Sequence, residues 1–200
     1  DQYLIEEVNK LNTKLFYFSG TMINGDPKLN GHLNFIAGET TNTFDEKKLL
    51  NNYMNLACDD FQGSTWAPHL IHKEVWNKVG GFSVEFSPGT GSDPDLNMKL
   101  WKLGVRIFKG VSKSRVYHFG SVVTRQKEKK FFSITDTGNK GNKIFLKKWG
   151  ISIRFFKKHY LRSDTKYEGQ LSEPKKNIDY FIDLIKVKLT YLYILFFHKI

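Results

Sequence analysis

The stretch Gly89-Thr90-Gly91-Ser92-Asp93-Pro94-Asp95-Leu96 combines a glycine-rich loop with the start of a helix. Asp93 is a favourable N-cap and Pro94 suits the first helical position, and the helix should end at Gly104. Its apolar face is formed by Leu96, Leu100 and Leu103. The stretch therefore predicts two carboxylates, Asp93 and Asp95, in one helical turn at an exposed edge. Taken alone, Asp93 would be only a capping residue, so its surroundings decide its interpretation.

Expected helices and expected strands alternate along the chain on both sides of this stretch, which indicates an α/β fold. A capping box, Thr43 with Glu46, should open one more helix, and Gly80 should end another. The expected helices cover residues 2–11, the segment after Thr43, 73–79 and the segment up to Gly104. The expected strands cover residues 15–18, 64–71, 105–108 and 114–119, with a turn-rich segment at residues 20–38.

The composition is that of one ordinary domain. The chain has 200 residues, of which 40% are hydrophobic and 15% aromatic, enough for a substantial core. The single cysteine, Cys58, excludes a disulfide scaffold and thiolate zinc sites and fits a reducing, cytoplasmic compartment. Because the sequence opens on Asp1 rather than methionine, we expect it to be the later part of a longer protein.

Most of the excess lysine and arginine residues lie in the C-terminal part of the chain, after residue 124. The formal net charge of +11 calls for an anionic partner or surface. Residues 125–200 form a basic, aromatic and largely helical extension, distinct from residues 1–124. Its basic side chains include Arg125, Lys127, Lys129, Lys130, Lys140, Lys143, Lys147, Lys148, Arg154, Lys157, Lys158 and Arg162.

The last segment, residues 176–200, has the pattern of an amphipathic helix. Lys188 interrupts it, whereas a spanning helix needs about 20 consecutive apolar residues, so we expect it to lie on an anionic membrane surface or to pack on protein. Its apolar face comprises Ile178, Phe181, Ile182, Ile185, Leu189, Leu192, Tyr193 and Phe196, with Asp179, Asp183, Lys186 and Thr190 opposite.

Four pieces in order carry a family resemblance. They are Gly63-Ser64-Thr65-Trp66, His72-Lys73-Glu74-Val75-Trp76-Asn77-Lys78-Val79-Gly80-Gly81-Phe82, Ser92-Asp93-Pro94-Asp95-Leu96 and Val116-Tyr117-His118. In order and spacing, residues 1–124 resemble the second half of a family 2 glycosyltransferase of GT-A fold. The resemblance implies a mixed sheet flanked by helices, with the nucleotide-binding half missing upstream. It also implies inverting transfer from a nucleotide sugar to a glycan or lipid-linked acceptor, as in surface polysaccharide synthesis.

The resemblance also assigns roles to residues. Asp93 matches the carboxylate that takes the proton from the acceptor hydroxyl. Ser92 stands where the family has a first acidic residue, and Trp66, Ser92 and Asp95 would line the acceptor site. Arg125 could reach the donor diphosphate.

A divalent cation is part of the same expectation. Mg²⁺ or Mn²⁺ would be held by His118 and by Asp1, interpreted as the last residue of a truncated Asp-x-Asp motif. Without the resemblance, a lone strand histidine such as His118 is more often a packed or exposed imidazole. His69 and His72 have no third ligand on a helix, and a strand would point them to opposite faces.

Two other functions remain open. The interleaved lysines and aromatics of residues 125–160 would suit a nucleic-acid-binding module without catalytic activity, but that leaves the acidic loop unexplained. A purely structural interpretation makes the extension an arm that packs on its own core or on another subunit. We favour the glycosyltransferase, peripheral at the inner face of the membrane.

Overall fold

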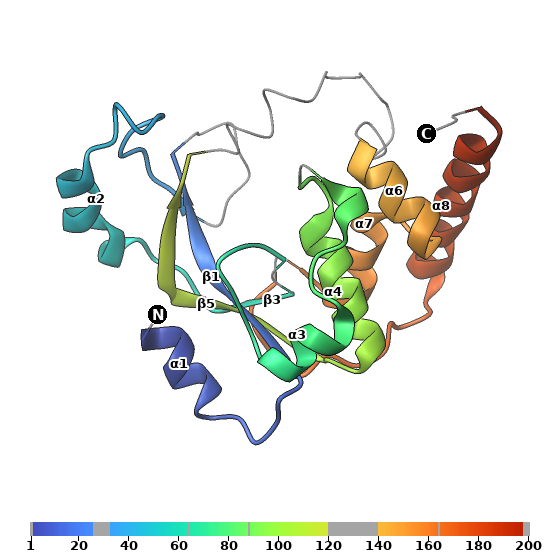
Figure 1. Cartoon of the computed structure of the whole chain (residues 1–200), viewed down its shortest axis with the longest axis horizontal. Coiled ribbons are helices and arrows are strands. Elements are labelled where there is room, and N and C mark those ends of the chain that lie inside the picture. The colour runs from blue at the N-terminus through green and yellow to red at the C-terminus, as the bar shows by residue number, and fades with distance from the viewer. Residues whose placement is uncertain are drawn as a thin grey trace.

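The computed structural model describes residues 2–25, 33–63, 65–87, 89–119, 140–163 and 165–197. They form a mixed α/β fold with helices on both sides of a sheet (Figure 1). The helices are α1 (Gln2–Val8), α2 (Glu46–Asn52), α3 (Lys73–Val79), α4 (Ser92–Leu103), α6 (Lys140–Trp149), α7 (Ile153–Phe155) and α8 (Ile178–Phe197). Short turns of 3-10 helix, η1 (Tyr53–Asn55) and η2 (Val84–Phe86), and a π-helical turn, η3 (Phe156–Leu161), accompany them. The expected α/β class is confirmed.

The sheet is built around two long parallel strands, β1 (Phe16–Asn24) and β5 (Ile107–His118). The spatial order is β2-β1-β5-β3, where β2 is Leu33–Asn34 and β3 is Phe61–Gln62. A further strand, β4 (His69–Ile71), runs antiparallel to the first half of β1. Strand β1 therefore lies at the centre, and its two halves have different neighbours on one side.

Two predicted strands are one strand in the structure. Residues 105–108 and 114–119 were expected to be separate, but β5 runs continuously across the polar segment between them. Its register against β1 shifts there, because Gly20 pairs with Val111 and Thr21 with Arg115. The carboxylate of Asp60 accepts a hydrogen bond of 2.8 Å from the Ser112 backbone N–H in this bulge. A polar bulge inside a strand resembles a turn in sequence.

Other boundaries also differ from the predictions. Strand β1 extends to Asn24, well into the segment expected to be turns, and only residues 69–71 of the strand expected at 64–71 form β4. Helix α2 is capped by Asp45, whose side chain accepts from the Lys48 N–H at 2.8 Å. The capping box at Thr43 was therefore wrong, since the Thr43 hydroxyl accepts from the Thr40 N–H in the preceding turn.

The two faces of the sheet carry separate apolar clusters. On β1, alternate side chains point to opposite faces. Phe16 and Phe18 pack with Leu4 of α1 on one face, whereas Tyr17 belongs to the main core on the other. That main core also contains Leu96, Leu100 and Trp101 from α4 and Phe145, Leu146, Phe155, Phe156 and Leu161 from the late helices.

The basic extension thus shares the core of the preceding segment. Its described part, residues 140–163 and 165–197, supplies many of the largest buried side chains. The expected boundary near residue 124 lies outside the described residues. What was expected to be an appendage is, where the structure describes it, a layer of helices packed on α4 (Figure 1).

Helix α8 has two apolar faces, of which the sequence pattern identified one. The predicted face is exposed, with Ile185 at 61% and Leu189 at 63% of their full exposure. The opposite face packs on the core through Tyr180, Leu184, Val187, Tyr191 and Ile194, spaced alternately by four and three residues. Among the described residues, none of the helices combines the length and apolarity required to cross a bilayer.

Candidate functional site

Asp93 lies in the first turn of α4 at the rim of the molecule. The helix begins at Ser92, and its N-cap is Gly91, whose φ of 87° lies in the left-handed region that favours glycine. The prediction that Asp93 caps the helix was therefore wrong. The side chain of Asp93 is 39% exposed. A carboxylate in this position faces the positive end of the helix dipole and remains accessible from solvent.

Asp93 is connected to the sheet through a histidine. His69 of β4 places its Nε2 3.4 Å from Asp93 Oδ1, and its Nδ1 lies 2.5 Å from the hydroxyl of Tyr17. The side chain of Asn97, one helical turn after Asp93, is hydrogen-bonded to Tyr17. Asn97, Tyr17, His69 and Asp93 therefore form one chain of polar groups that runs from the core to the surface.

Tyr17, at the buried end of this row of polar groups, determines which group donates a proton to its neighbour. Burial, and then the charge of Asp93, raises the pKa of Tyr17 well above its usual value of 10.0. The phenol is therefore a neutral O–H donor at ordinary pH. When it donates to His69 Nδ1, the remaining proton of a neutral imidazole is on Nε2, facing Asp93. A proton on Nε2 points the positive edge of the ring toward the Asp93 carboxylate, 3.4 Å away.

Asp95 lies in the opposite environment, only two residues further on. It is fully buried, and its oxygens accept from Ser83 Oγ at 2.6 Å and Trp149 Nε1 at 2.8 Å, with Lys148 Nζ at 2.9 Å. Burial acts to lower the pKa of Lys148, but hydrogen bonds to Glu85 and Asp95 raise it overall. Asp95 therefore ties α4 to α6. We remove it from the acceptor site, because no acceptor can reach a carboxylate that is fully covered.

The late helices also contact the loop that carries Asp93. The start of α6 approaches so closely that a Cβ on Gly141 would collide with the backbone carbonyl of Thr90. Gly91 is similarly confined by the ring of Phe86. The position of the acidic loop therefore depends on the packing of a helix some fifty residues later in the chain.

Ser92 and Trp66, the other residues expected to bind the acceptor, form contacts within the fold. The Ser92 hydroxyl donates to the Gly89 carbonyl at 2.6 Å, so it stabilises its own turn. Trp66 precedes β4 instead of lying within the strand expected at residues 64–71. Its ring lies 6.2 Å from that of Phe61, and Lys157 Nζ lies 5.3 Å from its centroid. Trp66 thus joins the β3 region to η3.

The expected metal ligands do not converge with Asp93. His118 is the last residue of β5, opposite Asn24, whereas His69 lies opposite Ser19. These positions on β1 are separated by about 17 Å at the usual rise of a strand. Asp1 and Arg125 lie outside the described residues. Within the described ranges, no group of three or more histidine, cysteine, aspartate or glutamate side chains has the arrangement of a metal site.

Sequence reasoning missed three members of the site: Tyr17, His69 and Asn97. His69 was considered only as half of a metal pair with His72. The histidine and the tyrosine are 52 residues apart and meet through the antiparallel pairing of β4 with β1. The one available signal was the position of Asn97, four residues after Asp93 on the same helical face. No family model, curated protein or solved structure matches the chain.

Proposed function

We propose that the chain is the acceptor-side part of an inverting glycosyltransferase with a GT-A-like fold. It would move a sugar from a nucleotide-sugar donor to a glycan or lipid-linked acceptor. The observation that carries the proposal is the exposed Asp93 carboxylate, held at the N-terminus of α4 by His69. The ordered sequence resemblance of residues 1–124 adds the reaction class.

Asp93 would act as the general base. The acceptor hydroxyl oxygen forms a bond to the anomeric carbon while the bond from that carbon to the diphosphate oxygen breaks. The hydroxyl proton passes to Asp93, and the nucleoside diphosphate leaves with the electron pair of the broken bond. His69 is a positioning residue in this scheme, because it contacts Asp93 and is itself fixed by the buried Tyr17.

The proposed Mg²⁺ or Mn²⁺ rests on the resemblance alone. His118, at the carboxyl end of a parallel strand, is the one expected ligand within the described residues. A single imidazole does not make a site for a hard cation, which prefers several oxygen ligands. The described residues therefore do not by themselves fit the metal, and we route no step through it.

The outer face of α8 supports a peripheral position at an anionic membrane surface. Eight side chains on this face are more than 45% exposed: Ile178, Phe181, Ile182, Ile185, Leu189, Leu192, Tyr193 and Phe196. Such a face binds lipid by burying apolar area, and nearby lysines add electrostatic attraction. Flotation with anionic liposomes tests this: replacing Ile185 and Leu189 by serine should abolish binding. Unchanged flotation would exclude the α8 face.

The base is tested by Asp93→Asn in the complete natural protein, assayed with its nucleotide-sugar donor. Asparagine keeps the shape of the side chain but cannot accept the proton, so transfer should fall by at least about 100-fold. Donor binding should remain. Asp45→Asn at the N-cap of α2 is a matched control, since it alters an exposed aspartate at the N-terminus of another helix, where asparagine also caps well, and it should leave transfer unchanged. Full activity of Asp93→Asn would remove Asp93 as the base.

A further inference from the structure

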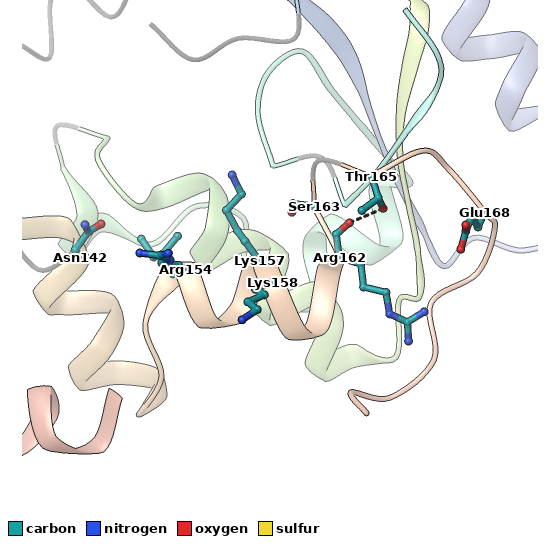
Figure 2. A pocket seen from close by; sticks show the side chains of 9 residues that line it. Asn142, Arg154, Lys157, Lys158, Arg162, Ser163, Thr165 and Glu168 are labelled. Carbon is teal, nitrogen blue, oxygen red and sulfur yellow. Dashed lines mark hydrogen bonds between the residues drawn. The ribbon is translucent and has the colours of Figure 1, made fainter. Parts of the chain in front are cut away.

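A second candidate site, which Asp93 does not line, is an open cleft of about 870 Å³ along α7 and η3 (Figure 2). Four cationic side chains line it: Arg154, Lys157, Lys158 and Arg162. Glu168 is the one acidic residue among the lining residues. The cleft therefore carries a strong positive charge, and its volume lies within the usual range for small-ligand pockets.

Most of this charge is not neutralised by the described part of the protein. Lys158 forms an ion pair of 2.6 Å with Asp183 of α8, and the Arg162 guanidinium donates to the neutral Ser172 hydroxyl at 2.6 Å. Lys157 lies over the ring of Trp66. Among the described residues, no carboxylate lies within 4 Å of the charged groups of Arg154, Lys157 or Arg162.

The spacing of these cations is unfavourable without an anion. Arg154 is three residues before Lys157 and four before Lys158, and the two lysine side chains leave the turn on different sides (Figure 2). Like charges at these spacings repel one another. A bound anion would remove the repulsion, whereas water only screens it.

The backbone of the cleft is also unusual. Residues 156–161 form a π-helical turn, a conformation that is rare and often found at functional sites. It ends at Arg162, whose φ of 50° is left-handed, although arginine has no preference for this region. The Ser163 hydroxyl donates to the Gly63 carbonyl at 2.7 Å and fixes the end of this turn against the sheet. The cationic residues are thus presented by a rigid support.

We propose that this cleft binds the diphosphate group of a larger ligand. An arginine guanidinium can donate two parallel hydrogen bonds to phosphate oxygens, and a lysine adds a compact charge. The cleft has room for more than a free diphosphate. The proposal does not rest on the proposed glycosyl transfer, because Asp93 and His69 do not line the cleft.

Calorimetric titration of the 200-residue chain with inorganic pyrophosphate tests the site. The double substitution Arg154→Gln with Lys157→Gln should weaken binding at least about tenfold, as expected for lost charge-assisted hydrogen bonds. The double substitution Lys47→Gln with Lys102→Gln is the matched control, because it removes the same charge from exposed positions on α2 and α4. The control should bind within about twofold of the unchanged chain, since surface charges act weakly at a distance.

A nucleoside diphosphate and a short-chain prenyl diphosphate then distinguish the two sources of the group. The proposal is supported if either ligand binds more tightly than pyrophosphate and the Arg154 and Lys157 double variant loses this binding. The ligand that binds more tightly then identifies the source of the diphosphate group. Equal weakening in both double variants would show a general charge effect and overturn the proposal. So would the absence of pyrophosphate binding at millimolar concentration. A single-stranded oligonucleotide is the last ligand to test. If it binds more tightly than any diphosphate, and the Arg154 and Lys157 double variant loses this binding, the cleft is a nucleic-acid site and the diphosphate proposal is overturned.

Discussion

Asp93 and Asp95 lie in the same helical turn, yet their surroundings are opposite. Asp93 is 39% exposed, and its one ion-pair contact with a described residue is the long one to His69, whereas Asp95 is fully buried and hydrogen-bonded from two directions. The difference arises because two residues that are two positions apart project from nearly opposite sides of an α-helix, about 200° apart around its axis. One side of the helix looks over β1 and β4, and the other is covered by α6. A pair of carboxylates in sequence is therefore two separate structural features, of which only one is available for chemistry.

The largest effect should come from Asp95→Ala. This substitution leaves the partly buried Lys148 with Glu85 but without Asp95, and it removes the acceptor of the Trp149 indole N–H. Breaking one side of a buried ion pair typically costs about 3–5 kcal/mol. We expect a loss of this size in the free energy of unfolding, measured by urea denaturation. A loss under about 1 kcal/mol would show that Asp95 does not join α4 to α6.

Trp149→Phe should have an intermediate effect. It keeps the aromatic ring of α6 but removes one hydrogen bond to the Asp95 carboxylate. Hydrogen bonds to charged groups contribute about 1.5–3 kcal/mol. The free energy of unfolding should fall by that amount, and it should not fall further when Trp149→Phe is added to Asp95→Ala. Full additivity in this double-mutant cycle would contradict the direct contact.

The ion pairs that Glu7 and Asp60 form with Lys109 should make the stability of the fold depend on pH. Burial would raise the pKa values of Glu7 and Asp60, but hydrogen bonds from Lys10 and Lys109 to Glu7, and from Lys109 and Ser112 to Asp60, lower them below 4.5 and 3.8. Because the folded values are lowered, this stabilisation is complete above about pH 5 and is lost as the pH falls through the folded pKa values. Lys109→Met should therefore reduce stability more at pH 5 than at pH 3, as measured by urea denaturation at both values. Equal losses would contradict the ion pairs.

The smallest effect on stability should come from Asp93→Asn. Its side chain is 39% exposed, and within the described ranges its contact to His69 Nε2 is long, at 3.4 Å. Exposed substitutions of this kind usually change the free energy of unfolding by less than about 0.5 kcal/mol. Differential scanning calorimetry should give nearly the same melting temperature as for the unchanged chain. A large decrease would make Asp93 a structural residue like Asp95 and weaken its proposed role as a base.

The sequence predicts these elements unevenly. The helix of α3 and its end at Gly80 follow from local signals, namely periodicity and a glycine in the left-handed region at φ 71°. By contrast, two partners of Asp95, Lys148 and Trp149, come from α6, and His69 reaches Asp93 from β4, where Tyr17 of β1 fixes it. No local pattern reports contacts between residues fifty positions apart. The same holds for α8, where the exposed apolar stripe was more conspicuous in sequence than the heptad spacing that packs on the core.

The close approach of Gly141 to Thr90 has a mechanical consequence. The contact is between backbone atoms, so no side chain can change its rotamer to absorb a shift. Helix α6 and the acidic loop can therefore move relative to one another only slightly. A displacement of α6 would be transmitted to the loop and so to the height of Asp93 above the sheet. We therefore expect a side chain introduced at residue 141 to shift the loop that carries Asp93, although this residue is not in contact with the carboxylate.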